Sequence, residues 1–124
     1  MESSPSITSS IIDGLFQLDV AIRYVALYLN GTLTSRERSG LPNASASESD
    51  KYEELIVNPT LLKLVQQRGN IDCGGVQYVL IRYGNFFEYV QPTKNGHISV
   101  GIEPDGDLSK TVRAIQHQLQ SNLS

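Results

Sequence analysis

The sequence predicts an α+β fold in which helices cover both faces of an antiparallel β-sheet. Residues 74–103 contain three runs rich in β-branched and aromatic residues, separated by short turn signals, which indicates a three-stranded meander. Residues 20–29 form the most apolar run of the chain and end at Asn30-Gly31, a dipeptide typical of a two-residue hairpin turn. Apolar residues recur at helical spacing before, between and after these strands. The predicted element order is therefore α-β-β-α-β-β-β-α.

The N-terminal part of this order is a helix followed by a hairpin. Ile7, Ile11 and Leu15 are spaced as on one face of a helix. The run from Val20 to Leu29 is apolar on both faces, which is typical of a central strand that is covered on both sides. Strict alternation assigns to one of its faces Val20, Ile22, Tyr24, Ala26 and Tyr28. The residues from Thr32 to Arg38 are mostly polar, which indicates an edge strand.

The segment from Ser39 to Ser49 is predicted to be a mobile surface loop, because it consists mainly of serine, alanine and other small or turn-forming residues. A connection of this length is uncommon, and long loops are often functional. A helix is expected next, and Ser47-x-x-Asp50 resembles the capping box that starts many helices.

Pro59 divides this middle helix. Proline in a helix interior causes a kink, and the residue before it avoids the α region. We therefore expect a bent or broken helix, with Asn58 as the cap of its second segment and Arg68-Gly69 as its end. The residues expected to face the protein are Leu61, Leu62, Leu64 and Val65.

The turns of the meander predict a register. A two-residue loop at Gly84-Asn85 sets Val79 opposite Val90, and one at Asn95-Gly96 sets Val90 opposite Gly101. With alternating side chains, one face collects Tyr78, Leu80, Phe87, Tyr89, Ile98, Val100 and Ile102. The other collects Val79, Ile81, Tyr83, Phe86, Val90, Ser99 and Gly101, with Glu88 and His97 towards its margins. A C-terminal helix follows, capped by Asp107, with an apolar stripe at Leu108, Val112, Ile115 and Leu119.

Length and composition limit the class of protein. The 124 residues suffice for one domain, residues 1–124, in which residues 121–124 are expected to form a flexible tail. A net charge of -3 and scattered basic residues exclude a nucleic-acid footprint. The single cysteine, Cys73, excludes an internal disulfide and is compatible with a reducing compartment. No apolar run is long enough for a membrane span, and residues 1–10 lack the pattern of a signal peptide, so we expect a cytoplasmic protein without membrane insertion.

The chain resembles the Roadblock/dynein light-chain family and its longin relatives, within the profilin-like fold. The matching stretches are Ile11-Ile12-Asp13-Gly14-Leu15 through Leu29-Asn30-Gly31, Gly75-Val76-x-Tyr78-x-Leu80-Ile81 and Gly96-His97-Ile98-Ser99-Val100. The resemblance implies the strand order 2-1-5-4-3, with the first and last helices on one face and the middle helix on the other. Members of this family usually form homodimers or heterodimers through the third strand and the middle helix, and act as adaptors, often for small GTPases or motor complexes.

The resemblance therefore implies a homodimer, with a small GTPase or another protein as a further partner. The third strand becomes an edge despite its apolar character, and such edges are normally blunted or paired. We expect the dimer interface to be built from Val76, Tyr78, Leu80, Arg82, Leu62 and Val65.

The residues predict no catalytic, cofactor or metal site. His97, beside a turn, and His117 have no evident partner carboxylate in the sequence, so both are expected at the surface. Glu103, Asp105 and Asp107 do not complete a calcium-loop pattern, and an isolated Cys73 is a loop residue.

These observations favour a non-enzymatic protein–protein interaction module. The alternative is a small-molecule-binding sensor or an enzyme with a pocket between sheet and helices, and a third possibility is a structural subunit of a larger complex. A buried polar cluster between sheet and helix would favour the sensor or enzyme, whereas a closed core and a flat apolar patch would favour the adaptor.

Overall fold

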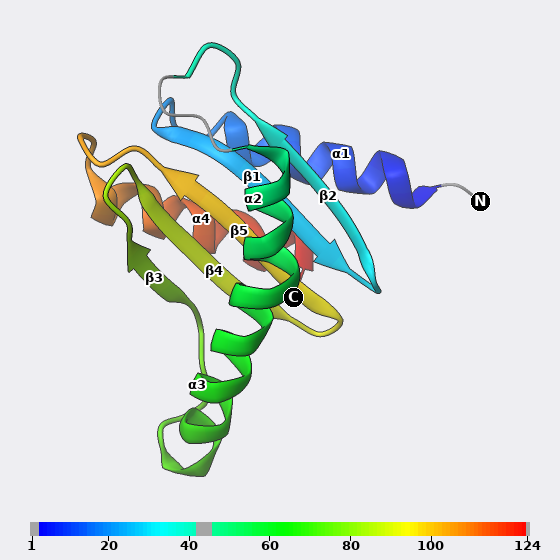
Figure 1. The fold of residues 1–124 in the computed structure, drawn as a ribbon, viewed down its shortest axis with the longest axis vertical. Coiled ribbons are helices and arrows are strands. Elements are labelled where there is room, and N and C mark those ends of the chain that lie inside the picture. Colours follow the sequence, from blue (N-terminus) through cyan, green and yellow to red (C-terminus); the bar gives the residue numbers. More distant parts are fainter. Residues whose placement is uncertain (1–2, 42–45, 124) are drawn as a thin grey trace.

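The computed structural model describes residues 3–41 and 46–123, with side chains placed at 7–41 and 46–120. Its five-stranded antiparallel sheet has the order β2-β1-β5-β4-β3, which confirms the predicted fold class and strand order (Figure 1). The elements are α1 (Ser3–Phe16), β1 (Ile22–Leu29), β2 (Thr32–Glu37), α2 (Ser47–Tyr52), the π-helix η1 (Glu53–Val57), α3 (Asn58–Asp72), β3 (Val79–Arg82), β4 (Phe87–Thr93), β5 (Gly96–Ile102) and α4 (Leu108–Leu123). Residues 42–45, in the predicted loop from Ser39 to Ser49, lie outside the described residues.

The main hydrophobic core lies between the sheet and the pair α1 and α4, which cover one face together (Figure 1). The helices contribute Ile11, Ile12, Leu15, Val112, Ile115 and Leu119, and the sheet contributes Ile22, Val25, Leu27, Tyr89, Ile98, Val100 and Ile102. Leu27 and Val100 are fully buried, as central positions in this sheet require. The middle helix crosses the opposite face (Figure 1).

The hairpins follow the sequence signals with one correction. Asn30 and Gly31 both have positive φ, 53° and 82°, as a tight two-residue turn demands. Val79 pairs with Val90 as predicted, but Val90 pairs with Ser99 and not with Gly101. The turn between β4 and β5 is one residue earlier than Asn95-Gly96, which shifts the register by two. Because side chains alternate with period two, this shift leaves both predicted faces unchanged.

The start of β1 differs from the prediction. Val20 precedes the strand and is 87% exposed. The register shifts between Ile22 and Tyr24, so strict alternation fails at this point. Ile22 consequently joins Val25 and Leu27 in the core beside α1 and α4, instead of sharing the face of Tyr24.

The middle helix does not break at Pro59. It continues from α2 through η1 into α3, and Asn58 is helical with φ -64° and ψ -45°, so Asn58 is not a cap. The Asn58 amide donates to the Glu53 carbonyl five residues back. Proline lacks the amide hydrogen that an α-helical bond would need, and the π-helical turn before it absorbs this loss without ending the helix.

Two further details of this helix differ from the sequence prediction. Ala46 occupies the N-cap position, and among the described residues no side-chain hydrogen bond caps α2, so the capping box at Ser47 and Asp50 is not formed. Gly69 does not end α3, which continues to Asp72. A Cβ at Gly69 would lie 3.2 Å from Val76 Cγ2 and 3.3 Å from the Gly75 carbonyl carbon, so this glycine lets the following chain fold back against the helix.

The return segment shortens the third strand. Gly74 and Gly75 have positive φ, and the Gly75 amide donates to the Gly69 carbonyl. The residues from Val76 to Tyr78 are therefore held beside α3, and β3 begins only at Val79. The predicted strand from Val76 to Tyr83 is thus four residues long.

Candidate functional site

A buried polar cluster joins the middle helix to the sheet. Its side chains come from the helix and from three strands, and all are buried: Tyr24, Glu54, Asn58, Glu88, His97 and Ser99. Alternation along β4 and β5 directs Glu88, His97 and Ser99 to the face opposite α1 and α4. Glu54 and Asn58 are four residues apart on the helix and therefore point to the same side.

Glu54 is the acceptor at the centre of the cluster. Its Oε1 accepts from Ser99 Oγ at 2.6 Å and Asn58 Nδ2 at 3.1 Å, and lies 2.8 Å from His97 Nε2. Its Oε2 accepts from the Tyr24 hydroxyl at 3.0 Å. A carboxylate oxygen accepts, so His97 must carry a hydrogen on Nε2. Four side chains from the helix and the sheet therefore converge on the Glu54 carboxyl group.

Glu88 has a different environment from Glu54. Its Oε2 accepts from Asn58 Nδ2 at 3.2 Å, and the same nitrogen is also shared with Glu54 and with Ser99 Oγ. Burial, first, and the nearby charge of Glu54 raise the pKa of Glu88 well above its ordinary value. Burial and the Glu54 charge likewise raise the pKa of the Tyr24 hydroxyl, which therefore remains a donor.

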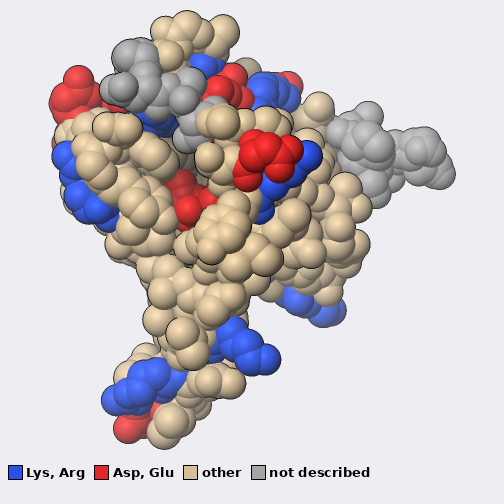
Figure 2. All heavy atoms as spheres, in the orientation of Figure 1, with Lys and Arg blue, Asp and Glu red and all other residues tan. Residues whose placement is uncertain are grey.

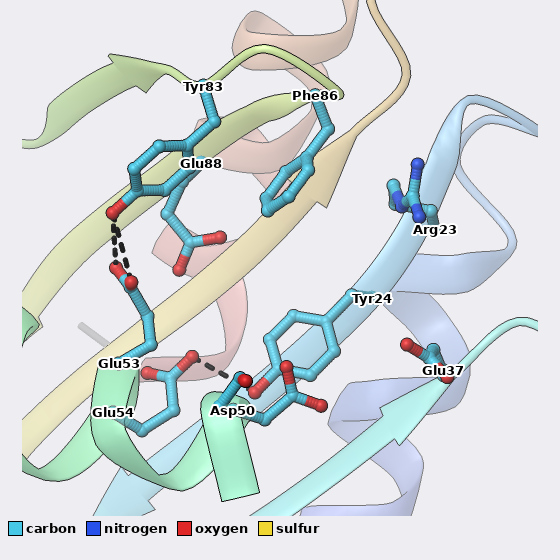
Figure 3. Close-up of a pocket in the computed structure, with 10 residues that line it drawn as sticks. Arg23, Tyr24, Glu37, Asp50, Glu53, Glu54, Tyr83, Phe86 and Glu88 are labelled. Atoms are coloured by element: carbon cyan, nitrogen blue, oxygen red, sulfur yellow. Dashed lines mark hydrogen bonds between the residues drawn. The ribbon is translucent and has the colours of Figure 1, made fainter. Parts of the chain in front are cut away.

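A cavity of about 210 Å³ lies beside the cluster (Figure 3). Five carboxylates line it: Glu37, Asp50, Glu53, Glu54 and Glu88. In Figure 3, Tyr83 and Phe86 close one side, and the Tyr83 hydroxyl donates to Glu53 Oε1 at 2.9 Å. Burial raises the pKa of Glu53, while the bond from Tyr83 opposes this. Figure 2 shows acidic side chains in a recess on this face of the molecule.

The cluster is not arranged for nucleophilic catalysis. The Ser99 hydroxyl donates to Glu54, so its proton is directed at a carboxylate and not at the imidazole of His97. The side chains of Ser99, Glu54 and His97 are all buried. In the described part of the chain, no group of three or more histidine, cysteine or acidic side chains is placed to hold a metal ion.

A second candidate site is the surface formed by α3 and the chain leading into β3. Leu64 is 61% exposed and Ile71 75%, and Tyr78 and Leu80 are also exposed. We call these four residues the α3–β3 surface, although Tyr78 and Leu80 lie on the sheet face of Tyr89 and α3 covers the other face. An open hollow of about 440 Å³ lies between α3 and the return segment, lined by Val65, Arg68, Gly69, Cys73, Gly75, Val76, Gln77, Tyr78 and Val79. The hollow joins the exposed helix to the start of β3.

The residues predicted for the dimer interface are only partly exposed. Tyr78, Leu80 and Arg82 are exposed, and Val76 and Val65 are half-buried. Leu62 is 4% exposed and packs within the protomer. Leu64 was expected to face the protein and faces solvent instead, because buried Leu62 is two residues away and therefore on the opposite side of the α-helix.

His97 corrects the sequence prediction most clearly. It was expected at the surface without a carboxylate, yet it is 2% exposed and contacts Glu54. Sequence reasoning also missed the roles of Glu54, Asn58 and Glu88. One signal was available, because the predicted meander placed Glu88 and His97 on a face that helices should cover. Their shared partner, Glu54, lies on an element distant in sequence.

The other singled-out residues have ordinary roles. His117 and Cys73 are exposed, as expected. Asp107 Oδ1 accepts from the Lys110 amide at 3.2 Å, which makes it the expected cap of α4. Glu103 is bound to Arg23 at 3.3 Å. None of the helices in the described part of the chain has the length and apolarity that crossing a bilayer requires.

The strand order and the helix arrangement define a Roadblock-like fold. A Roadblock/LC7 domain from Streptomyces avermitilis superposes with a TM-score of 0.68 at 14% identity, over 90% of this chain and 91% of that chain. The gliding protein MglB from Thermus thermophilus gives 0.67 at 11% identity, over 95% and 89%. An MglB structure described with a tetrameric arrangement gives 0.64 at 12%, over 92% and 86%. No family model and no curated protein matches the sequence.

Proposed function

We propose that this protein is a non-enzymatic interaction module that pairs with a second copy of itself through the α3–β3 surface. The observation that carries the proposal is that the edge strand β3 and the helix before it, α3, both carry exposed apolar side chains. Large apolar groups and open strand edges attract partners unless they are covered. Pairing about a two-fold axis would cover both, since each copy offers the same surface.

The geometry of α3 supports this pairing. Leu64 and Ile71 are two helical turns apart and lie on one face of the helix. The C-terminal part of α3 extends past the sheet (Figure 1), and Leu64 and Ile71 lie on the side of α3 away from buried Leu62 and Gly69. β3 is the last strand in the sheet order, and among the described residues it pairs only with β4. A second copy is therefore a matched cover for this region.

The fold neighbours are consistent with self-association. One MglB structure is described with a tetrameric arrangement, which is a property of that protein. The same fold can thus support an assembly of several copies.

Sedimentation of the purified protein across the micromolar range tests the pairing. We expect a dimer for the natural sequence and a shift towards monomer in Ile71→Lys and Leu80→Lys, because each places a charge in an apolar contact. Val20→Lys is the matched control, because Val20 is an exposed apolar residue away from this surface. A monomer at high concentration of the natural sequence would contradict the proposal.

Leu64→Lys and Ile71→Lys are cleaner variants than Tyr78→Lys. Tyr78 stacks on buried Tyr89 with ring centroids 5.0 Å apart, so its replacement also disturbs the protomer. Leu64 and Ile71 are exposed and take part in none of the core contacts. Loss of dimer without loss of thermal stability in these two variants would assign the effect to the interface.

We further propose a cytoplasmic adaptor or regulator whose partner is a small GTPase or a larger complex. This partner class follows from the resemblance to the Roadblock family and from the shared fold. Capture of purified small GTPases from the native cell, loaded in turn with GDP and a GTP analogue, tests it. Binding that distinguishes the two nucleotides supports the proposal, and equal absence of binding in both states contradicts it.

A small-molecule sensor is the second candidate function. The cavity of about 210 Å³ and the buried polar cluster are the features that favour it. The excess of carboxylates around the cavity matches a small organic cation. Thermal unfolding with and without spermidine tests this candidate, with Glu53→Gln as the variant and Glu48→Gln, an exposed acid on α2, as the control. Equal shifts in both variants would indicate unspecific binding.

A further inference from the structure

The buried cluster contains more acceptors than donors. Glu54 and Glu88 bring two carboxyl groups to a single amide nitrogen, Asn58 Nδ2, which also lies 3.0 Å from Ser99 Oγ. Asn58 Oδ1 is buried and has no hydrogen-bond partner among the described residues. The one hydroxyl hydrogen of Ser99 is already directed at Glu54. A proton held on Glu88 would convert one of these acceptors into a donor.

The charges around Glu88 also favour a retained proton. The titratable and charged groups that face the cluster are Asp50 from α2, Glu53 and Glu54 from η1, Arg23, Tyr24 and Tyr28 from β1, Glu37 from β2, Tyr83 beyond β3 and His97 from β5. Most of the charged members are acidic. Arg23 is engaged with Glu103 and lies over the Phe86 ring, and His97 is directed at Glu54. Two ionised carboxylates in this buried site would repel each other.

The middle helix depends on this cluster for its attachment. Its fully or nearly buried side chains are Glu54, Asn58 and Leu62, of which only Leu62 is apolar. The other face of the sheet instead holds the main apolar core. Elements with few buried apolar contacts are the ones that open locally before the whole chain unfolds.

We propose that docking of the middle helix onto the sheet is a proton-linked switch, in which Glu88 holds a proton while the helix is docked and releases it to solvent when the helix lifts away. In the docked state Glu88 is a neutral carboxyl group that shares the amide nitrogen of Asn58 with Glu54. In the lifted state water solvates Glu88, which ionises at its ordinary pKa. Each lifting event therefore releases one proton from Glu88, and the smaller rise in the pKa of Glu53 adds to this only at the acidic end of the range. A rise in pH favours the lifted state, and a fall in pH favours the docked state.

The sign and the pH window follow from proton linkage. The raised pKa of Glu88 means that the docked state binds one more proton than the lifted state at pH values above the ordinary glutamate value of 4.5 and below the raised one. Within this window the equilibrium constant for lifting increases about tenfold per pH unit. Below the window both states hold the proton, and above it neither does, so the dependence vanishes at both ends.

Native-state hydrogen exchange of the full chain tests this switch. Protection factors remove the pH dependence of the chemical exchange rate, so their remaining change reports the opening reaction. For the amides in α3 near Leu62, we plot the logarithm of the opening equilibrium constant against pH. We expect this plot to have a slope close to one. Amides in β1 and β5 are expected to stay protected more strongly. A flat wild-type profile for α3 between about pH 5 and 8 would overturn the proposal without any variant.

Glu88→Gln identifies the proton. Glutamine preserves the size of a neutral carboxyl group but does not titrate, so we expect the slope for α3 to fall to zero. Glu53→Gln is the matched control, because it removes a neighbouring carboxylate on the helix and should retain the slope while narrowing the pH window. A slope that persists in Glu88→Gln would overturn the assignment. A common slope and a common opening constant in α3, β1 and β5 would also overturn it, because the whole chain would then be unfolding.

The switch does not require the proposed dimer. The same exchange series on Leu80→Lys separates the two ideas, because that substitution lies on the α3–β3 surface and not in the polar cluster. A slope of one in a monomeric Leu80→Lys protein supports the switch alone. If the slope for α3 is zero in both the natural sequence and Leu80→Lys, the switch is overturned. The dimer proposal is then tested by sedimentation alone.

Discussion

The two faces of the sheet are held in different ways. On one face, α1 and α4 bury aliphatic side chains against Val25, Leu27 and Val100. On the other, the middle helix meets the sheet through Glu54, Asn58 and their polar partners, with Leu62 as its one buried aliphatic contact. Both helical layers cover the same strands, yet one relies on non-directional burial and the other on hydrogen bonds.

This difference separates stability from positional specificity. Apolar packing contributes in proportion to buried area and tolerates small displacements. A buried polar network contributes little net stability when complete, but every displaced partner leaves an unsatisfied group. The polar face therefore fixes where the middle helix lies, and this helix carries Leu64 and Ile71 of the α3–β3 surface. The proposed proton on Glu88 belongs to this network, so the position of the proposed interface should depend on pH.

The largest effect is expected where the polar network loses its central acceptor. Glu54→Ala leaves buried donors on Tyr24, Asn58, His97 and Ser99 without their carboxylate. We expect a loss of about 3–5 kcal/mol in the free energy of unfolding, measured by urea denaturation. Glu48→Ala, which removes an exposed carboxylate from α2, is the control and should cost little. A loss below about 1 kcal/mol would mean that the network does not hold the helix.

Truncation on the apolar face should have a somewhat smaller minimum cost in unfolding free energy and a different signature. Leu27→Ala creates a cavity under α1 and α4 and is expected to cost about 2–5 kcal/mol. Val20→Ala removes an exposed side chain and should change stability by less than about 0.5 kcal/mol. Unlike Glu54→Ala, Leu27→Ala should leave the relative protection of α3 amides unchanged. If Leu27→Ala selectively reduced the hydrogen-exchange protection of α3 amides, the two faces would not be held independently.

Ser99→Ala probes the polar face with a smaller change. The Ser99 hydroxyl donates to Glu54 at 2.6 Å and lies 3.0 Å from Asn58 Nδ2, so its removal breaks two contacts while leaving the Glu54 charge in place. We expect a loss of about 1–3 kcal/mol by denaturation. Ser35→Ala, at an exposed position on β2, is the matched control. Equal values for the two serines would indicate that the buried hydroxyl is not needed.

The apolar face could be predicted from the sequence because its signal is periodic. Leu27 and Val100 lie in runs whose alternation identifies their face, and α4 has a stripe at helical spacing. The wrong register between β4 and β5 did not disturb this assignment, because a shift of two residues preserves alternation. Ile22 was misplaced because a local irregularity in β1 has no periodic signature.

The polar face could not be predicted as a network because its bonds connect distant parts of the chain. Glu54 lies in a run that reads as an exposed, acidic helix start, and nothing local directs it to His97 or Ser99. Pro59 correctly indicated an irregular helix, but the response was a π-helical turn and not a break. The π-helical turn carries Glu54 and ends next to buried Asn58, so the site includes a backbone adjustment that residue propensities do not encode.

The exposed ion pair between Asp13 and Arg36 gives the smallest expected effect and isolates the role of burial. It joins α1 to β2 at 2.5 Å, with both side chains about half exposed, whereas the contact of Glu54 with His97 is sealed from solvent. Water solvates both partners of the exposed pair when they separate, so little is left unsatisfied. A double-mutant cycle with Asp13→Ala and Arg36→Ala should give a coupling energy of about 0–1 kcal/mol, falling further in added salt. A cycle with Glu54→Ala and His97→Ala should give a larger coupling that salt changes little. If both pairs gave the same coupling and the same salt dependence, burial would not be what distinguishes the polar face, and the comparison between the two contacts would fail.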